Sequence, residues 1–168
     1  LATIVAFLKP QSIVEFGTYL GASALTFMLN APAAKLLTID LPDEPGDISN
    51  LPPVDKDHVA SSRNMIGKWY KGTAQEARIQ QLQCDSRSLD LSKYVERADL
   101  VLIDGGHDVE CVSADTKNAF KVIRSGGVVL WDDYFWLYPD VVEFLDELSS
   151  THELACIQGT NLVAHLCR

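Results

Sequence analysis

Short apolar runs that end in an acid or a glycine recur along the chain, with helix-like stretches between them. Three of these runs have the nearly continuous hydrophobic character of strands that are buried on both faces. Strands that alternate with helices predict a parallel sheet with helices on both sides. The five runs span residues 12–17, 35–40, 78–85, 98–106 and 126–133.

Two further apolar runs, residues 153–158 and 161–168, are joined by a Gly-Thr turn and predict a closing antiparallel hairpin. The resulting expectation is an α/β fold: a Rossmann-like, seven-stranded, mostly parallel sheet with an antiparallel last strand and helices on both faces. The chain has 168 residues, which suits one domain over 1–168. Because no methionine precedes Leu1, we expect a chain trimmed at its N-terminus.

Helical periodicity is clearest in residues 108–124 and 139–150. Asp108 is expected to cap the first of these helices, and the pair Gly126-Gly127 is expected to stop it. Pro139 suits the first turn of the second helix.

The middle of the chain is less regular. Residues 21–30 predict a short helix, and residues 41–56, rich in Pro, Asp and Gly, predict a long loop. A helix is expected over 57–71. Loops of this length in compact domains often serve function.

The charge of the chain limits its partners. Acidic residues outnumber basic ones by 23 to 14, for a formal net charge of −9. This balance argues against nucleic-acid binding, which needs clustered Lys and Arg. No apolar run is long enough to span a bilayer, so no membrane partner is expected. The cysteines, with neither zinc-ligand nor disulfide-scaffold spacing, suggest reduced thiols in a cytoplasmic protein. They are Cys84, Cys111, Cys156 and Cys167.

The first apolar run leads into a turn that carries two glycines, Gly17 and Gly21. A dinucleotide site would show G-x-G-x-x-G, but Tyr19 replaces the middle glycine and Glu15 adds a negative charge. The negative charge of Glu15 and the bulk of Tyr19 disfavour a pyrophosphate. They suit a nucleoside with a cationic tail, such as S-adenosylmethionine. Asp40 follows 23 positions after Gly17, where an acid can bind ribose hydroxyls.

Two segments carry a resemblance to a known family. The motif VEFGTYLGAS (14–23) is similar to the first motif of catechol O-methyltransferase-like enzymes. The block LIDGGHDVECVSADTKNAFKVIRSGGVVLWDDY (102–134) looks like the methyltransferase-24 type. The chain thus resembles class I S-adenosylmethionine-dependent methyltransferases over nearly its whole length.

This resemblance implies where the cofactor lies. The first turn would line the methionine part, Asp40 would hold the ribose, and Asp85 with Ser86 would lie by the adenine. Asp104 would lie near the methyl group. The implied binding set is Glu15, Gly17, Thr18, Tyr19, Gly21, Ser23, Asp40, Leu41, Asp85, Ser86 and Asp104.

Methyl transfer to a hydroxyl needs a base, a metal, or both. His107 lies where the catechol enzymes have a lysine base and is the candidate base, with Asp104 as its catalytic neighbour. Asp104, Asp132 and Asp133 follow neighbouring predicted strands and could hold Mg²⁺. The alternatives are purely structural: His107 could be a hydrogen-bonded turn residue, and the three acids could cap helices or face solvent.

The leading functional hypothesis is O-methylation of a small hydroxylated acceptor, such as a sugar or natural product. One alternative is a non-catalytic module that binds a nucleoside. Another is an NAD-dependent oxidoreductase, which the missing G-x-G-x-x-G disfavours. The aromatic run 134–138 hints at a homodimer contact or a lid.

Overall fold

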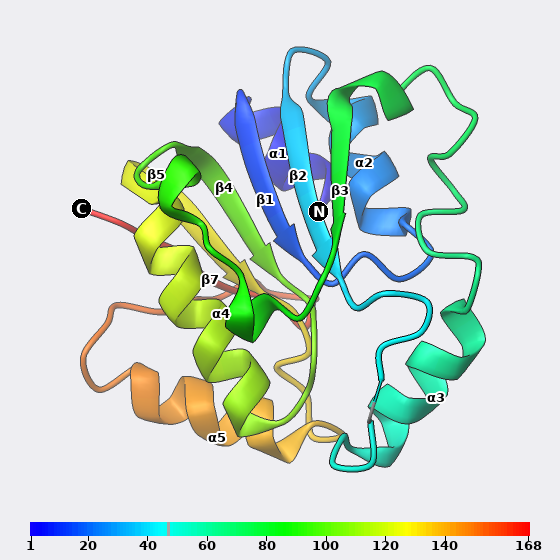
Figure 1. The fold of residues 1–168 in the computed structure, drawn as a ribbon. Helices are drawn as coiled ribbons and strands as arrows, with labels where there is room; N and C mark the ends of the chain where they lie inside the picture. The colour runs from blue at the N-terminus through cyan, green and yellow to red at the C-terminus, as the bar shows by residue number, and fades with distance from the viewer. Residues whose placement is uncertain (47) are drawn as a thin grey trace.

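The computed structural model describes residues 1–46 and 48–168, and these form a seven-stranded sheet in the order β3-β2-β1-β4-β5-β7-β6 (Figure 1). The first five strands in this order pair in parallel, and β7 runs antiparallel to both β5 and β6. The predicted fold class is therefore confirmed. The strands are β1 (Ser12–Phe16), β2 (Lys35–Asp40), β3 (Ile79–Gln83), β4 (Ala98–Ile103), β5 (Ile123–Trp131), β6 (Ala155–Cys156) and β7 (Val163–Leu166).

Helices cover both faces of the sheet, as Figure 1 shows. Side chains of alternate strand residues point to opposite faces, so β1 directs Ile13 to one core and Val14 and Phe16 to the other. The α-helices are α1 (Ala2–Leu8), α2 (Ala22–Asn30), α3 (Pro53–Ser62), α4 (Val109–Val122) and α5 (Pro139–Leu148). Short 3₁₀ turns are η1 (Glu76–Arg78), η2 (Ser86–Ser88) and η3 (Ser92–Tyr94).

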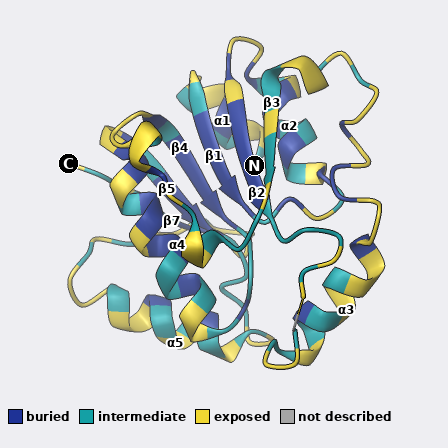
Figure 2. Ribbon diagram, viewed as in Figure 1, coloured by how far each residue is buried: buried dark blue, intermediate teal, exposed yellow. Residues whose placement is uncertain are grey.

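The two cores differ in the helices that close them. On one face, α1 and α2 pack through Val5, Ala24 and Phe27; on the other, α4 and α5 pack through residues such as Val112 and Leu145. The central strands are accordingly dark blue in Figure 2, which marks them as buried. Each Å² of apolar surface that the two cores remove from water stabilises the fold by roughly 25 cal/mol.

Strand register brings the ends of β1, β2 and β4 to the same edge. Ile13 lies between Leu36 of β2 and Leu100 of β4. At the edge itself, the Gly17 N–H donates to the Ile39 carbonyl at 2.8 Å, and the Asp104 N–H donates to the Phe16 carbonyl at 2.8 Å. The residues that follow these strands are therefore neighbours, as the parallel sheet predicted.

Two predicted helix boundaries are confirmed and one is wrong. Asp108 caps α4, since its Oδ1 accepts from the Cys111 N–H at 2.8 Å, and Pro139 occupies the first turn of α5. The pair Gly126-Gly127 does not stop α4. Instead α4 ends at Val122, and both glycines lie inside β5, beside an irregularity in its pairing with β4.

The helix expected over 57–71 is also wrong in its bounds. The observed α3 spans Pro53–Ser62, and turns follow to Gly72. Pro53 occupies its first turn, where a missing N–H costs nothing, so the double proline marks a helix start inside the expected 41–56 loop. Position 47 of that loop lies outside the described residues. Figure 1 shows α3 beyond the carboxyl ends of the strands rather than over either face.

Within 1–46 and 48–168, no helix combines the length and the hydropathy that a membrane span requires. In the predicted contact or lid segment 134–138, Trp136 is 74% exposed. The homodimer stays a prediction.

Candidate active site

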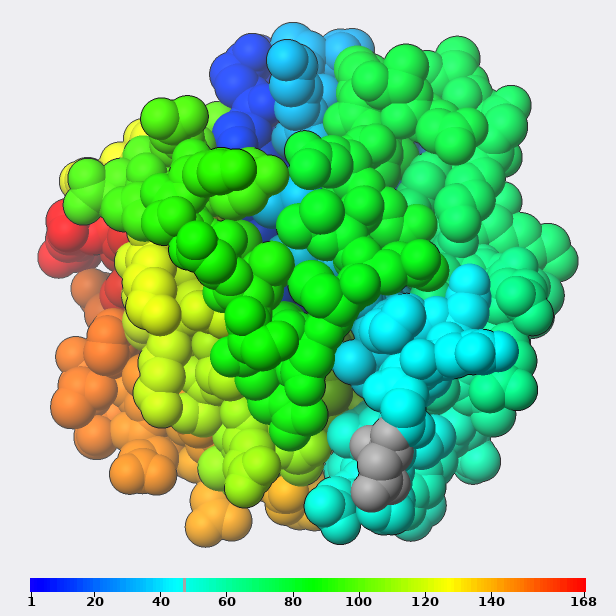
Figure 3. Space-filling model, in the orientation of Figure 1, coloured from blue at the N-terminus to red at the C-terminus, as the bar shows by residue number. Residues whose placement is uncertain are grey.

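A cavity of about 300 Å³ lies at the carboxyl ends of the parallel strands. Its walls come from the segments after β1, β2, β3 and β4, and from α3. In the space-filling view, the green segment after β3 lies beside the cyan segment after β2 over this edge (Figure 3). The size and position suit a small-molecule site in an open α/β sheet.

Most of the predicted site residues meet at this cavity. Those that line it are Gly17, Tyr19, Asp40, Leu41, Asp85, Ser86, Asp104, His107 and Asp133. The others do not line it: Glu15, Thr18, Gly21, Ser23 and Asp132, of which Asp132 lines a smaller cavity next to it. The sequence missed several wall residues, among them Asp55, His58, Arg87, Asp115 and Tyr138.

The turn after β1 is shaped by Gly17 and Asp40. Gly17 has a φ of +92°, and a Cβ there would lie 1.8 Å from the Asp104 carbonyl oxygen, so only glycine fits. The Asp40 carboxylate accepts from the backbone N–H groups of Thr18 (3.0 Å), Tyr19 (2.6 Å) and Leu41 (2.7 Å). Asp40 therefore fixes the turn, and burial raises its pKa. Its contact with a ribose stays a prediction.

Glu15 is fully buried beneath this turn. Its Oε2 accepts from the Thr38 hydroxyl at 2.5 Å, while its Oε1 has no hydrogen-bond partner among the described residues. Burial raises the pKa of Glu15 to about 7, and the nearby hydroxyls of Ser23 and Thr38 oppose the shift. A carboxylate with an unpaired oxygen favours a cation nearby.

Another part of the cavity wall holds Asp85, Arg87 and Asp115. Arg87 forms a forked pair with Asp85, whose Oδ2 lies 2.7 Å from Nη2, and the hydrogen bond from the Arg87 side chain lowers the pKa of Asp85. Asp115 projects from α4 and is buried. Burial raises its pKa to about 7, and its Oδ1 has no partner among the described residues. This part of the wall therefore offers polar side-chain atoms to a ligand.

The three acids of the predicted metal set gather at the ends of β4 and β5. Asp104, Asp132 and Asp133 line one small cavity there. Burial raises the pKa of Asp104 well above its usual range, and the charges of Asp132 and Asp133 raise it further. Carboxylates that share one cavity can offer oxygen ligands to a hard cation. Among the described residues, however, the group whose ligand atoms meet within 4.8 Å is Asp55, His58 and His107, and not these three acids. Metal binding at this place stays a prediction.

His107 lies between two carboxylates. Its Nδ1 is hydrogen-bonded to Asp55 Oδ1, and its Nε2 lies 2.9 Å from Asp133 Oδ2. The ring stacks on Tyr138 with centroids 4.2 Å apart. Burial lowers the pKa of His107, but the hydrogen bonds to Asp133 and then Asp55 outweigh it and raise the pKa to about 9. In this arrangement His107 is a cation at neutral pH.

Asp55 and His58 come from α3, in and next to the segment that the sequence analysis assigned to a loop. They are three positions apart, a spacing that places side chains on one side of a helix. An Asp-x-x-His pattern after a double proline is the signal that could have drawn attention to them. Nothing in the sequence indicates that they face His107.

A model of the methyltransferase-24 family, described as a methyltransferase domain, matches residues 14–134 of the chain. The chain belongs to this methyltransferase family. The match runs from β1 past the end of β5 and includes most of the cavity wall. As a methyltransferase-24 member, the protein is an S-adenosylmethionine-dependent methyltransferase, as the sequence predicted. The nicotinamide-dependent alternative is thereby set aside.

Solved structures agree with the family in their fold. The S-adenosylhomocysteine-bound methyltransferase PaMTH1 of Podospora anserina has a TM-score of 0.66 at 17% identity, with 99% of this chain and 76% of that chain covered. A candidate caffeoyl-CoA O-methyltransferase from Staphylococcus aureus has a TM-score of 0.65 at 10% identity, with 97% of this chain and 78% of that chain covered. CalS11, the TDP-rhamnose 3'-O-methyltransferase of calicheamicin biosynthesis, has a TM-score of 0.64 at 14% identity, with 98% of this chain and 76% of that chain covered. No curated protein matches the chain.

Proposed function

We propose that this methyltransferase-24 member transfers the methyl group of S-adenosylmethionine to a hydroxyl oxygen of a small acceptor, such as a sugar or natural product. The observation that carries the proposal is the cavity at the strand ends, where Gly17, Asp40, Asp85 and Asp104 meet. Its acidic lining suits a nucleoside with a cationic tail and no phosphate. The net charge of −9 disfavours a nucleic-acid acceptor.

We assign the cofactor to the carboxyl edge of the sheet. The turn from Gly17 to Ser23, which follows buried Glu15 with its unpaired Oε1, would hold the methionine part. Asp40 and Leu41 would hold the ribose, and Asp85 and Ser86 the adenine. Asp104 and His107, which line the same cavity, would then lie nearest the methyl group.

The chemistry at that end is an in-line displacement. The acceptor oxygen attacks the methyl carbon, the carbon–sulfur bond breaks, and the hydroxyl proton leaves to a base. The protein's main contribution is alignment, which holds the two reacting atoms near attack distance. We assign the base to His107 and the orientation of the acceptor to Asp104.

A base must first lose its own proton, and two carboxylates hold the proton on His107. A cation at Asp104, Asp132 and Asp133 would engage Asp133 and remove one of the two hydrogen bonds that raise the pKa of His107. The same cation would supply positive charge that favours an ionised acceptor oxygen. The base and the metal set are therefore parts of one proposal.

Two of the similar structures support an oxygen acceptor. CalS11 acts on TDP-rhamnose, and the Staphylococcus aureus protein is a candidate O-methyltransferase. Both share only the fold with this chain, so the acceptor class is our inference.

The test is methyl transfer from labelled S-adenosylmethionine to a panel of hydroxylated sugars and phenols, in EDTA and in Mg²⁺. We expect turnover on at least one acceptor, and a loss of about 10²-fold or more in His107→Gln. Equal turnover of the wild type and His107→Gln across pH 6–10 would overturn the base assignment. Equal turnover in EDTA and Mg²⁺ would overturn the metal set.

A further inference from the structure

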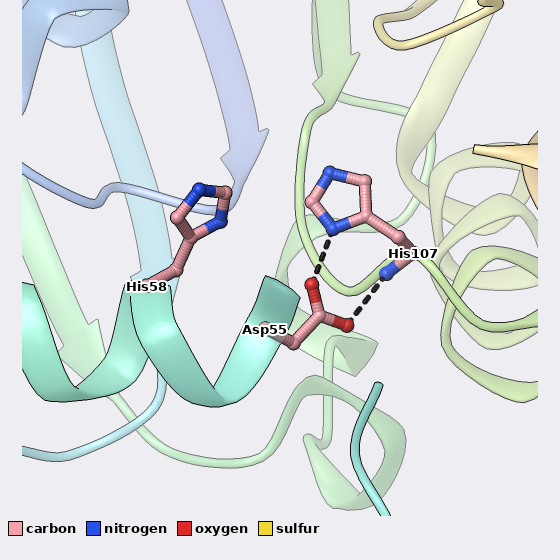
Figure 4. A group of neighbouring side chains, drawn as sticks. All are labelled: Asp55, His58 and His107. Atoms are coloured by element: carbon pink, nitrogen blue, oxygen red, sulfur yellow. Dashed lines mark hydrogen bonds and ion pairs between the residues drawn. The ribbon is translucent and has the colours of Figure 1, made fainter. Parts of the chain in front are cut away.

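We infer that Asp55, His58 and His107 form a second metal site, one for a divalent ion that accepts imidazole ligands. Each residue offers one ligand atom, and these three atoms all lie within 4.8 Å of one another. Figure 4 shows the two imidazole rings and the carboxylate of Asp55 gathered between α3 and the segment after β4. All three residues line the main cavity.

The local fold places the ligands with little freedom. Asp55 and His58 share one side of α3, and the proline in its first turn fixes where that helix begins. Asp55 is 6% exposed and His107 is 9% exposed, so neither side chain can move far into solvent. Asp55 Oδ2 also accepts from the His107 backbone N–H at 3.0 Å, which keeps the carboxylate turned toward the ring.

The surroundings of His107 match those of a metal-bound histidine. Such a histidine uses one ring nitrogen for the ion and donates the other N–H to a carboxylate. Asp133 Oδ2, at 2.9 Å from Nε2, provides that carboxylate and leaves Nδ1 facing Asp55. In the arrangement described, a proton lies between Nδ1 and Asp55. Metal binding at ligands of this kind displaces such protons.

The ligand set indicates the class of ion. Two imidazoles and one carboxylate suit Zn²⁺, Co²⁺, Ni²⁺ or Fe²⁺, whereas Mg²⁺ prefers oxygen ligands. Three protein ligands also leave coordination positions open toward the cavity. The site is thus distinct from the all-oxygen set of Asp104, Asp132 and Asp133.

This inference does not rest on the proposed methyl acceptor, but it does constrain His107. An ion on Nδ1 takes the electron pair of that nitrogen, so His107 cannot bind the ion and act as the base at the same time. The protein loaded with Zn²⁺ is therefore expected to be a different catalytic form from the protein with Mg²⁺ alone.

The test is calorimetric titration of Zn²⁺ into protein stripped of metal with EDTA and then freed of EDTA, with no Mg²⁺ added, and with Co²⁺ absorption spectra in parallel. We expect one ion per chain, a Co²⁺ spectrum without a thiolate charge-transfer band, and at least about 10-fold weaker Zn²⁺ binding in His58→Ala. His152→Ala is the control, since that ring stacks on Phe120 and not at the cavity. It should bind like the wild type.

Three outcomes would overturn the site: wild-type affinity in His58→Ala, equal weakening in His152→Ala, or a strong thiolate band, which would assign the ion to Cys84 or Cys111 at the same cavity. Thermal unfolding of His58→Ala is measured beside these. A melting temperature close to that of the wild type shows that a loss of Zn²⁺ binding comes from the missing ligand and not from unfolding. Titration of S-adenosylhomocysteine into the metal-free wild type keeps failure of the metal site separate from failure of the methyltransferase proposal.

Discussion

The carboxylate of Asp55 accepts hydrogen bonds from both the backbone N–H and the ring Nδ1 of His107, although 52 positions separate them in the chain. This pair joins α3 to the segment after β4, on either side of the cavity. The ring of His107 is thereby held in one orientation and kept protonated. Several of the properties that we expect of this protein depend on that contact.

We expect Asp55→Asn to lower the pKa of His107 from about 9 toward its ordinary value, because one of two carboxylates that favour the imidazolium is lost. NMR titration of the histidine ring protons measures this directly. Asp57→Asn, an exposed acid on the same helix, is the matched control and should leave the titration unchanged. An unshifted His107 in Asp55→Asn would contradict the account.

His107 should also make stability depend on pH. Its pKa is about 9 in the folded protein and near 6.5 when unfolded, so the folded state binds more protons between these values. The contribution is fully present below pH 6.5 and is lost as pH rises through 9, by up to about 3 kcal/mol. Urea unfolding at pH 6 and pH 9.5 should show this fall in the wild type. In His107→Gln the free energy of unfolding should change less between these two pH values. An equal change in both proteins would contradict the raised pKa of His107.

Glu15 should also make the protein less stable as pH rises, but over a lower pH range than His107. Its pKa rises from 4.5 to about 7 on folding, so the free energy of unfolding falls as pH rises between these values, by about 3 kcal/mol. Glu15→Gln keeps the shape of the side chain and removes the charge. We expect the difference in unfolding free energy between pH 5 and pH 7.5 to shrink in this variant, as measured by denaturant titration. A difference as large as that of the wild type would count against a buried carboxylate.

Gly17→Ala should be far more damaging than a matched glycine substitution. Both Gly17 and Gly72 have a positive φ, but only at Gly17 would a Cβ meet another atom, the Asp104 carbonyl oxygen at 1.8 Å. Gly72→Ala should cost only about 1 kcal/mol of backbone strain. We expect Gly17→Ala to cost several times as much and to abolish binding of S-adenosylhomocysteine. Thermal unfolding and calorimetry of the two variants decide this, and similar melting temperatures would contradict the close approach.

Local patterns were sufficient to predict the sheet. Buried parallel strands appear as continuous apolar runs, and their ends carry the acids and glycines that line the cavity. The helix bounds were harder to predict where patterns compete. Gly126 and Gly127 resemble a helix stop but lie inside β5, and α3 has too few apolar residues for a helical period to stand out.

The site was predictable only in part, for a physical reason. Residues that follow parallel strands must meet at one edge, so Asp40 and Asp104 could be placed together from the sequence. The contact of Asp55 with His107 depends instead on how α3 packs beyond that edge. No local pattern encodes such packing, and the effect of two carboxylates on the pKa of His107 was therefore hidden as well.

The most direct test of the central claim is calorimetric titration of S-adenosylhomocysteine into the purified chain, first in EDTA and then in Mg²⁺. We predict one molecule bound per chain under both conditions. Affinity should be about 10-fold or more weaker in Asp40→Asn, which loses the carboxylate assigned to the ribose. Asp43→Asn is the control and should bind normally, because Asp43 does not line the cavity and its Oδ1, which accepts from the Asn64 N–H, is retained in Asn. No binding of S-adenosylhomocysteine under either condition would contradict the account of a cofactor cavity at the strand ends.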